Sequence, residues 1–287
     1  MVPHFPPDQK YLTATKQPES SIIYSMDGAT APLASITFFH LRSGRRWHAL
    51  KQMRSGPTML EQEPGMRFSR LMGTGRGIGF DPRPNFRVYS VLAVWDSLES
   101  CHRFLTGEWY RSYSSWCDDV FTVLQFPLRT RGTWGGANPF EPAIHVARTP
   151  VRGVITRATI RTSRLISFWK AVPRASRAAG KASGRIFSVG IGELPLVQQA
   201  TYSLWEDEEA ITRFAYRGAA HKAAIRDTHR LNWYSEELFA RFAPVATIGR
   251  WWQPIPLPAE GITRFEAVPP QAELLRAVYP PEQTAER

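Results

Sequence analysis

An internal repeat constrains the fold of this chain more than any other feature of its sequence. Residues 34–136 and 153–252 carry the same series of short apolar segments in the same order. The segment LAVW at 92–95 corresponds to YSLW at 202–205, and RGTW at 131–134 corresponds to IGRW at 248–251. The repeat predicts two copies of one supersecondary unit that bury their apolar faces against each other.

Each copy predicts six elements, in the order strand, helix, strand, strand, helix, strand. The strands are short runs enriched in β-branched and aromatic residues, and the helices have apolar residues at three- and four-residue spacing. In the first copy we expect strands at 34–42, 67–80, 86–95 and 120–136, and helices at 45–53 and 96–119. In the second copy we expect strands at 153–161, 185–193, 197–205 and 238–252, and helices at 165–179 and 206–232.

This order is that of a ferredoxin-like βαββαβ unit, whose antiparallel sheet carries helices on one face and needs cover on the other. Two such units facing each other form an α+β fold, a dimeric α+β barrel within one chain. We expect the two halves at 32–136 and 153–252, joined by a connector at 137–152. The proline-bearing stretches 1–31 and 253–287 are expected to be flexible tails.

Composition excludes several classes of protein. With 43% hydrophobic and 12% aromatic residues, the chain is not globally disordered. No apolar run reaches the roughly 18–20 residues of a spanning helix, and no secretory signal is evident, so a cytoplasmic protein is expected. The net charge of +11 would suit an anionic partner, but no nucleic-acid-binding motif accompanies it, and we expect no nucleic acid. Cys101 and Cys117 do not have the spacing of a zinc site, although a lone thiolate bound to haem iron stays open.

Four glycines alternate in GTGRGIG at 73–79, and the second copy repeats the pattern at 190–192. A proline-rich turn follows instead of a helix, so the segment does not fit a phosphate-binding loop. Alternation places the glycines on one face of a strand. They either produce bulges and barrel curvature, or their missing side chains at Gly75, Gly77 and Gly79 open a cavity for a flat macrocycle or a polyene.

The candidate metal ligands are seven histidines: His4, His40, His48, His102, His145, His221 and His229. No HExxH motif is present, and no spacing supports two histidines with a carboxylate, which disfavours a non-haem metal centre. His221 differs because it follows the small residues of RGAA on a helix expected to pack near the sheet. By position alone it fits a partly buried helix histidine better than an axial haem ligand.

Several segments resemble the spheroidene monooxygenase family of acyclic carotenoid ketolases. They are GTGRGIGFDPRPNFRVYSVLAVW (73–95), NPFEP (138–142), RAT (157–159), VGIGELPLVQQATYSLWED (189–207), HKAAIR (221–226) and NWYSEELFARF (232–242). The similarity covers residues 34–252 in order and spacing. The family keeps a histidine where His221 stands, so the resemblance implies that His221 is the axial ligand. Where family members can show histidine in the NxxV segment, this chain has Arg87.

The resemblance implies a haem-dependent monooxygenase that inserts oxygen into a carotenoid beside its conjugated system, giving a hydroxyl and then a ketone. A ferredoxin-type donor would supply electrons. Haem is expected between the two halves, with Arg157 as the distal catalytic residue or a propionate partner and a surface strand charge as the alternative. Arg83 and Arg87 are candidates for binding propionates. Because a polyene dissolves in membranes, peripheral contact of the basic surface with a membrane is also expected.

Two further function classes fit the same residues. Aldoxime dehydratases also have two fused ferredoxin-like units, which suggests a haem lyase that acts on an N–O substrate without external electrons. The third class is a haem-binding or small-molecule-binding barrel with no catalysis. Fold alone does not choose among these classes.

Overall fold

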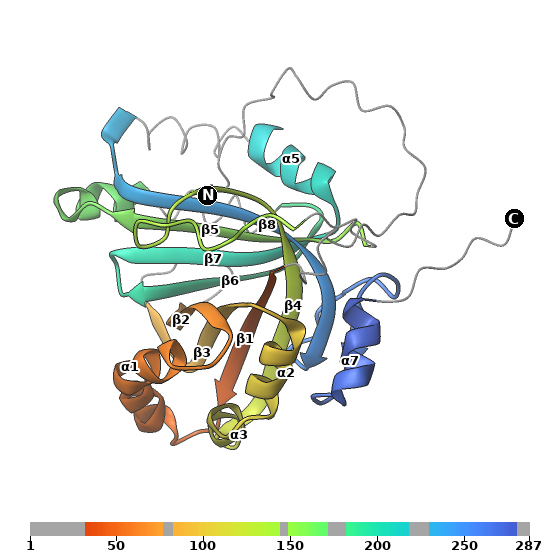
Figure 1. Ribbon diagram of the computed structural model, residues 1–287. Helices are drawn as coiled ribbons and strands as arrows, with labels where there is room; N and C mark the ends of the chain where they lie inside the picture. The colour runs from red at the N-terminus through yellow and green to blue at the C-terminus, as the bar shows by residue number, and fades with distance from the viewer. Residues whose placement is uncertain (1–31, 77–82, 144–148, 172–181, 218–229, 280–287) are drawn as a thin grey trace, which may run out of the picture.

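The computed structural model describes residues 32–76, 83–143, 149–171, 182–217 and 230–279 (Figure 1). The first unit contains β1 (Leu33–Leu41), α1 (Arg46–Glu61), β2 (Met66–Gly75), β3 (Pro84–Trp95), α2 (Leu98–Thr106), α3 (Glu108–Ser114) and β4 (Cys117–Gly132). The second unit contains β5 (Arg152–Ile160), the short 3-10 helix η1 (Thr162–Arg164) with helical residues 165–171, β6 (Arg185–Leu194), β7 (Gln198–Trp205), α5 (Glu208–Arg217) and β8 (Tyr234–Gly249).

The strands of the two units form one closed antiparallel sheet. Their order is β4-β1-β3-β2-β6-β7-β5-β8, and β8 pairs back with β4. The β4–β8 seam is long and runs from the pair Phe121–Gly249 to the pair Gly132–Leu238. The dimeric α+β barrel expected from the repeat is therefore confirmed.

The second seam, between β2 and β6, is short and is built on glycine. It consists of the pairs Gly73–Gly192 and Thr74–Ile191, with irregular register beside both glycines. A Cβ atom on Gly192 would lie 2.7 Å from the carbonyl oxygen of Gln198. Bulging and close backbone approach therefore explain Gly192 at this seam. Gly77 and Gly79 lie outside the described residues.

Side chains from both units fill the interior of the barrel. Aromatic and aliphatic residues from the two sheets form one buried cluster there, in which Phe38 of β1 contacts Phe187 of β6 at a centroid distance of 5.9 Å. The Tyr202 hydroxyl donates a hydrogen bond to Gln125 Oε1 at 2.9 Å across the same space. The expected position of haem between the two units is corrected accordingly, because a macrocycle in the middle of the barrel would collide with these side chains.

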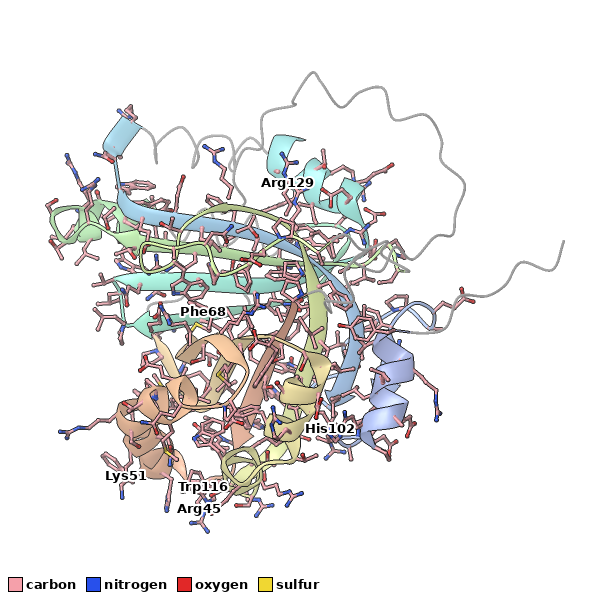
Figure 2. The ribbon with its side chains drawn as sticks, viewed as in Figure 1. Arg45, Lys51, Phe68, His102, Trp116 and Arg129 are labelled. Atoms are coloured by element: carbon pink, nitrogen blue, oxygen red, sulfur yellow. The ribbon has the colours of Figure 1, made fainter. Side chains whose placement is uncertain are left out.

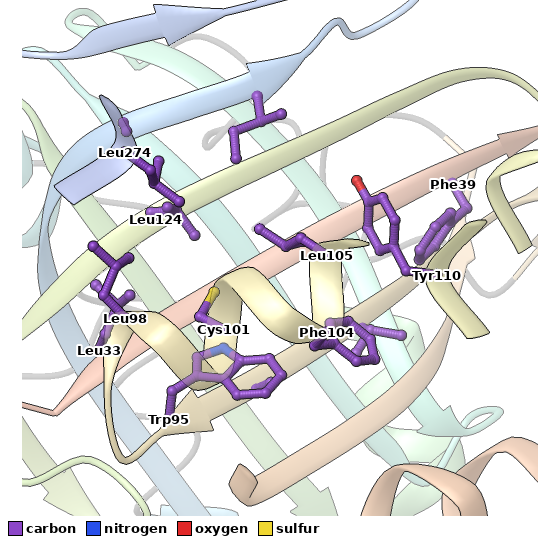
Figure 3. Close-up of a cluster of buried hydrophobic side chains, with 14 of the residues drawn as sticks. Leu33, Phe39, Trp95, Leu98, Cys101, Phe104, Leu105, Tyr110, Leu124 and Leu274 are labelled. Atoms are coloured by element: carbon purple, nitrogen blue, oxygen red, sulfur yellow. The ribbon is translucent and has the colours of Figure 1, made fainter. Parts of the chain in front are cut away.

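Helices cover the exterior face of the first unit's sheet. The α2 helix begins at Ser97, whose side chain accepts a hydrogen bond from the backbone N–H of Ser100 at 3.2 Å. Large apolar residues of α2 and α3 then pack onto the strands (Figure 3). Phe39, for example, lies against Tyr110 and Tyr113 at centroid distances of 5.7 and 4.5 Å. No helix in the described part of the chain is both long and apolar enough to cross a membrane.

The C-terminal segment packs on the barrel, although the sequence predicts a flexible tail over 253–287. The strand β9 (Thr263–Phe265) pairs parallel with β8, and the helix α7 (Gln271–Val278) lies beside the first unit (Figure 1). Leu274 and Val278 are fully buried there. The tail prediction followed the prolines and overlooked two apolar residues four positions apart, which share one face of a helix. Residues 280–287 and 1–31 lie outside the described residues.

Candidate functional site

The exterior face of the second unit's sheet differs from that of the first. Strand register shows which positions of the two units are equivalent. In the first unit β3 ends at Trp95, which pairs with the first residues of β1 and β2. In the second unit β7 ends at Trp205, which pairs with the first residues of β5 and β6 in the same way. At two such exterior positions the first unit has large side chains and the second has small ones, since Phe39 and Leu71 correspond to Ala158 and Gly190. At a third position Thr201 corresponds to Val91, with nearly the same size but a hydroxyl group in place of one methyl group. We call Ala158, Gly190 and Thr201 the exterior strip.

Two separate hydrophobic clusters flank the exterior strip. At one end, α5 packs Ala210 and Ile211 against Val154 and Trp205. At the other, helical residues 165–171 place Phe168 against Trp233, at a centroid distance of 5.6 Å. The strip belongs to neither cluster. The segments that follow the two helices, 172–181 and 218–229, lie outside the described residues, and His221 is in the second of them.

Ion pairs fix the start of α5 to the sheet. Glu208 in the first turn of α5 pairs with Arg241 of β8 and, at 3.8 Å, with Arg152 of β5. Burial, together with the nearby positive charges of Arg129 and Arg152, lowers the pKa of Arg241 to about 10. A carboxylate paired with two guanidinium groups therefore anchors α5, the helix that precedes His221 in the sequence.

Arg157 lies inside the barrel and is not a surface charge, because its side chain is 2% exposed. Its guanidinium donates a hydrogen bond to Glu236 of β8, and its Nη2 lies 3.8 Å from Glu193 of β6. Arg70 of the first unit binds Glu193 at 2.7 Å, and the Trp134 indole N–H donates to the same carboxylate at 2.7 Å. This interior ion network therefore joins the two units. The catalytic role of Arg157 stays a prediction.

The three other predicted binding residues within the described chain lie at the first unit. Arg87 is half exposed and donates to the Leu41 carbonyl oxygen and, at 3.0 Å, to Asp118. Arg83 is exposed, and its carbonyl oxygen accepts a hydrogen bond from Arg76. Gly75 lies on the rim of a pocket of about 470 Å³ at one end of the barrel. Their roles in cofactor binding stay predictions.

The described histidines have structural partners or are exposed. His40 faces the interior end of the barrel, where its ring lies 4.3 Å from that of Trp252 and 3.6 Å from Asp119. Burial and the positive charge of Arg87 lower its pKa, so it is neutral near pH 7. His102 bonds to the Pro269 carbonyl oxygen at 2.9 Å, and His48 is exposed.

Neither cysteine is suited to bind iron. Both are buried in the hydrophobic core between the first unit's sheet and the helices that cover its exterior face. Burial raises the pKa of Cys101 and raises that of Cys117 to about 12, so both remain thiols at neutral pH. Because a thiolate is the form that binds metal, the alternative of a thiolate ligand loses its support.

The described residues fit haem on one point, the small side chains on the exterior face of the second unit's sheet. Where Phe39 occupies the exterior face of the first unit, Ala158 has only a methyl group at the equivalent position of the second, and Gly190 has no side chain. The positions of the exterior strip were missed from the sequence. A residue-by-residue alignment of the two copies, extended beyond their landmark tryptophans, would have revealed them.

These features define a single-chain dimeric α+β barrel in which the exterior face of the second unit's sheet carries smaller side chains than that of the first. No protein-family model matches the sequence. Spheroidene monooxygenase of Rhodobacter capsulatus is 36% identical over 243 residues, which cover 82% of this chain and 100% of that protein. Spheroidene monooxygenase of Cereibacter sphaeroides is 34% identical over 255 residues, which cover 88% of this chain and 78% of that protein. The chain belongs to the spheroidene monooxygenase family, as its sequence segments predict.

Among solved structures, an aldoxime dehydratase is 12% identical and gives a TM-score of 0.48 over 75% of this chain and 84% of its own. An aldoxime dehydratase in complex with butyraldoxime, also 12% identical, gives a TM-score of 0.46 over 74% of this chain and 79% of its own. The fold assignment rests on the strand order described above and takes no support from these likenesses.

Proposed function

We propose that the protein is a haem-dependent monooxygenase that oxidises a carotenoid or a similar hydrophobic polyene. Family membership supports the monooxygenase activity and the class of substrate. The observation that carries the haem site is the exchange of Phe39 and Leu71 in the first unit for Ala158 and Gly190 at the exterior strip of the second. In this proposal His221 would hold the haem iron, and the exterior strip would line the site of the bound group.

Each part of the site has a distinct task. His221 would hold the iron, and the small side chains of the exterior strip would line the macrocycle. Glu208 fixes the start of α5, the helix that precedes His221 in the sequence, by pairing with Arg241 and Arg152. When bound, haem supplies the redox centre at which dioxygen is activated. Arg157 lies on the other face of the same strand from Ala158, so in this proposal it is a positioning residue that holds β5 against the first unit through Glu193 and Glu236.

The reaction proposed is oxidation of a methylene carbon beside the conjugated system. One oxygen atom of dioxygen replaces a C–H hydrogen as a hydroxyl, and the other leaves as water with two electrons and two protons from the donor. A second oxygenation at the same carbon, followed by loss of water, gives the ketone. A ferredoxin-type protein is the proposed donor, because an acidic surface would complement a chain of net charge +11.

Haem titration of the purified protein tests the proposal. We expect a Soret band in the wild-type protein that is lost or clearly shifted in His221→Ala, whereas the exposed-histidine control His48→Ala keeps it. With reductant and dioxygen, the wild-type protein should oxidise a detergent-dispersed acyclic carotenoid. Absence of haem uptake by the wild-type protein would remove the cofactor from the proposal. Turnover of an aldoxime without any reductant would instead establish the lyase alternative.

A further inference from the structure

An exposed apolar surface occurs where the turn between β6 and β7 meets helical residues 165–171. Leu194 is 51% exposed, Leu196 43% and Ile166 75%. The two segments are in contact, since the Trp169 indole N–H donates a hydrogen bond to the Leu196 carbonyl oxygen at 3.0 Å. The exposed side chains of Leu194 and Leu196 therefore belong to a turn that contacts the helical segment carrying Ile166 and Trp169. Exposed apolar residues of this kind on a water-facing surface are typical of an interaction site.

The backbone of the turn makes the exposed leucine more unusual. Leu196 has φ of +68°, in the left-handed region that asparagine or glycine adopts at lower cost. Neither burial in the core nor backbone preference explains a leucine there. An apolar medium outside the protein would explain it, because the side chain would leave water when the protein is bound.

The chain segment that contains helical residues 165–171 is rich in basic residues. The stretch from residue 142 to residue 192 contains no aspartate or glutamate, and it contains ten lysines and arginines: Arg148, Arg152, Arg157, Arg161, Arg164, Lys170, Arg174, Arg177, Lys181 and Arg185. Arg161, Arg164 and Lys170 lie beside the turn and are exposed. Within the described ranges, none of these three forms a salt bridge with a carboxylate. An anionic surface would therefore meet cations whose charge is not already neutralised by a described carboxylate.

We propose that this docking turn, made of Leu194, Leu196, Ile166 and Trp169 with Arg161, Arg164 and Lys170, inserts into the interface of a membrane that carries anionic headgroups. Aliphatic side chains enter the acyl boundary, the tryptophan lies at headgroup level, and the cations pair with lipid phosphates. Docking deepens the proposed function, because it would give the enzyme access to a substrate dissolved in lipid. Only this purpose of docking rests on the proposed function. The same helical residues 165–171 flank the exterior strip, so docking would bring the membrane to that unit.

A second exposed apolar pair provides a matched control. Trp47 and Leu50 on α1 are 70% and 40% exposed, and residues 28–60 around them also contain no aspartate or glutamate, but they belong to the first unit, away from the exterior strip. Figure 2 shows Lys51 of the same helix at the lower edge of the first unit. The proposal predicts that α1 does not carry membrane binding.

Co-sedimentation of the full chain with phosphatidylcholine vesicles, with and without phosphatidylglycerol, tests the docking turn. We expect binding only when phosphatidylglycerol is present, and a loss of at least about tenfold in Leu194→Ser/Leu196→Asn, since two leucines no longer leave water. Asparagine relieves the backbone at position 196, so this variant should fold at least as well as the wild type. Arg164→Gln/Lys170→Gln should lose about fivefold per charge removed. The control Trp47→Ser/Leu50→Ser should bind like the wild type.

Three results would overturn the docking turn: equal binding to neutral vesicles, wild-type binding by the leucine variant, or loss of binding in the α1 control alone. Haem uptake and turnover of a detergent-dispersed substrate should be unchanged in the leucine variant. Failure of the docking turn therefore leaves those two assays positive, whereas failure of the proposed function leaves them negative while vesicle binding persists.

Discussion

At the scale of single residues, the interior ion network decides how firmly the two units are joined. Arg157 is almost completely buried, so removing the charge of its nearest partner leaves a cation with only Glu193 at 3.8 Å. We expect Glu236→Gln to lower the free energy of unfolding by on the order of 3 kcal/mol, the cost of an uncompensated buried charge. Glu237→Gln, one residue away on the exterior face, should change it by less than about 0.5 kcal/mol. Urea unfolding of both variants measures the difference, and equal stabilities would show that the network contributes nothing.

The same carboxylate predicts a pH dependence. Burial acts to raise the pKa of Glu236, but hydrogen bonds from the Gly136 N–H, Arg157 and the Thr133 hydroxyl outweigh it and hold the pKa below 4.5. A lowered carboxylate pKa adds stability above the unfolded value, and that stability is lost as the pH falls through the folded value. We therefore expect the wild-type protein to lose stability below pH 4.5 more steeply than Glu236→Gln. Parallel curves of unfolding free energy against pH would contradict this.

At the scale of elements, the short β2–β6 seam offers two glycines that face each other with different surroundings. A Cβ atom on Gly192 would meet the Gln198 carbonyl oxygen at 2.7 Å, whereas one on Gly73 would meet nothing within 4 Å. We expect Gly192→Ala to destabilise the protein by about 1–3 kcal/mol through overpacking. Gly73→Ala should be neutral or stabilising by up to about 1 kcal/mol, because it restricts only the unfolded chain. Thermal unfolding compares the two, and a larger loss in Gly73→Ala would contradict the seam geometry.

The docking of α7 is a second test at this scale. Leu274 is fully buried against the first unit, and its neighbour Leu275 is 48% exposed. Leu274→Ala should cost about 2–5 kcal/mol, the usual range for a buried leucine. Leu275→Ala should cost less than about 0.5 kcal/mol. If the C-terminal segment were a flexible tail, both substitutions would leave the denaturation midpoint unchanged.

At the scale of the whole molecule, the repeat explains both what the sequence predicts and what it conceals. Two copies with matching landmarks, among them Trp95 and Trp205 at the ends of β3 and β7, were enough to predict the units, their order and the closed barrel. The register of each strand follows from its alternation of buried faces. The packing of α7 was missed, since proline-rich composition outweighed two buried apolar positions. Arg157 was expected near haem or at the surface, but pattern alone does not show which face of a doubly covered strand points inward. His221, the predicted axial ligand, lies outside the described residues, so its role stays a prediction.

The difference between the units leads to the last prediction. Phe39 and Ala158 are equivalent positions on the exterior faces of β1 and β5, and only the first is filled by a side chain that packs under helices. Ala158→Phe makes the second unit resemble the first, and we expect it to abolish haem uptake while the protein stays folded by circular dichroism. Phe39→Ala makes the opposite change, and it should cost about 3–5 kcal/mol of stability while haem uptake is retained. Absorption spectra and thermal unfolding of both variants separate these effects. Undiminished haem uptake in Ala158→Phe would place the cofactor elsewhere, and the best remaining position would then be the pocket beside Gly75 at the end of the barrel.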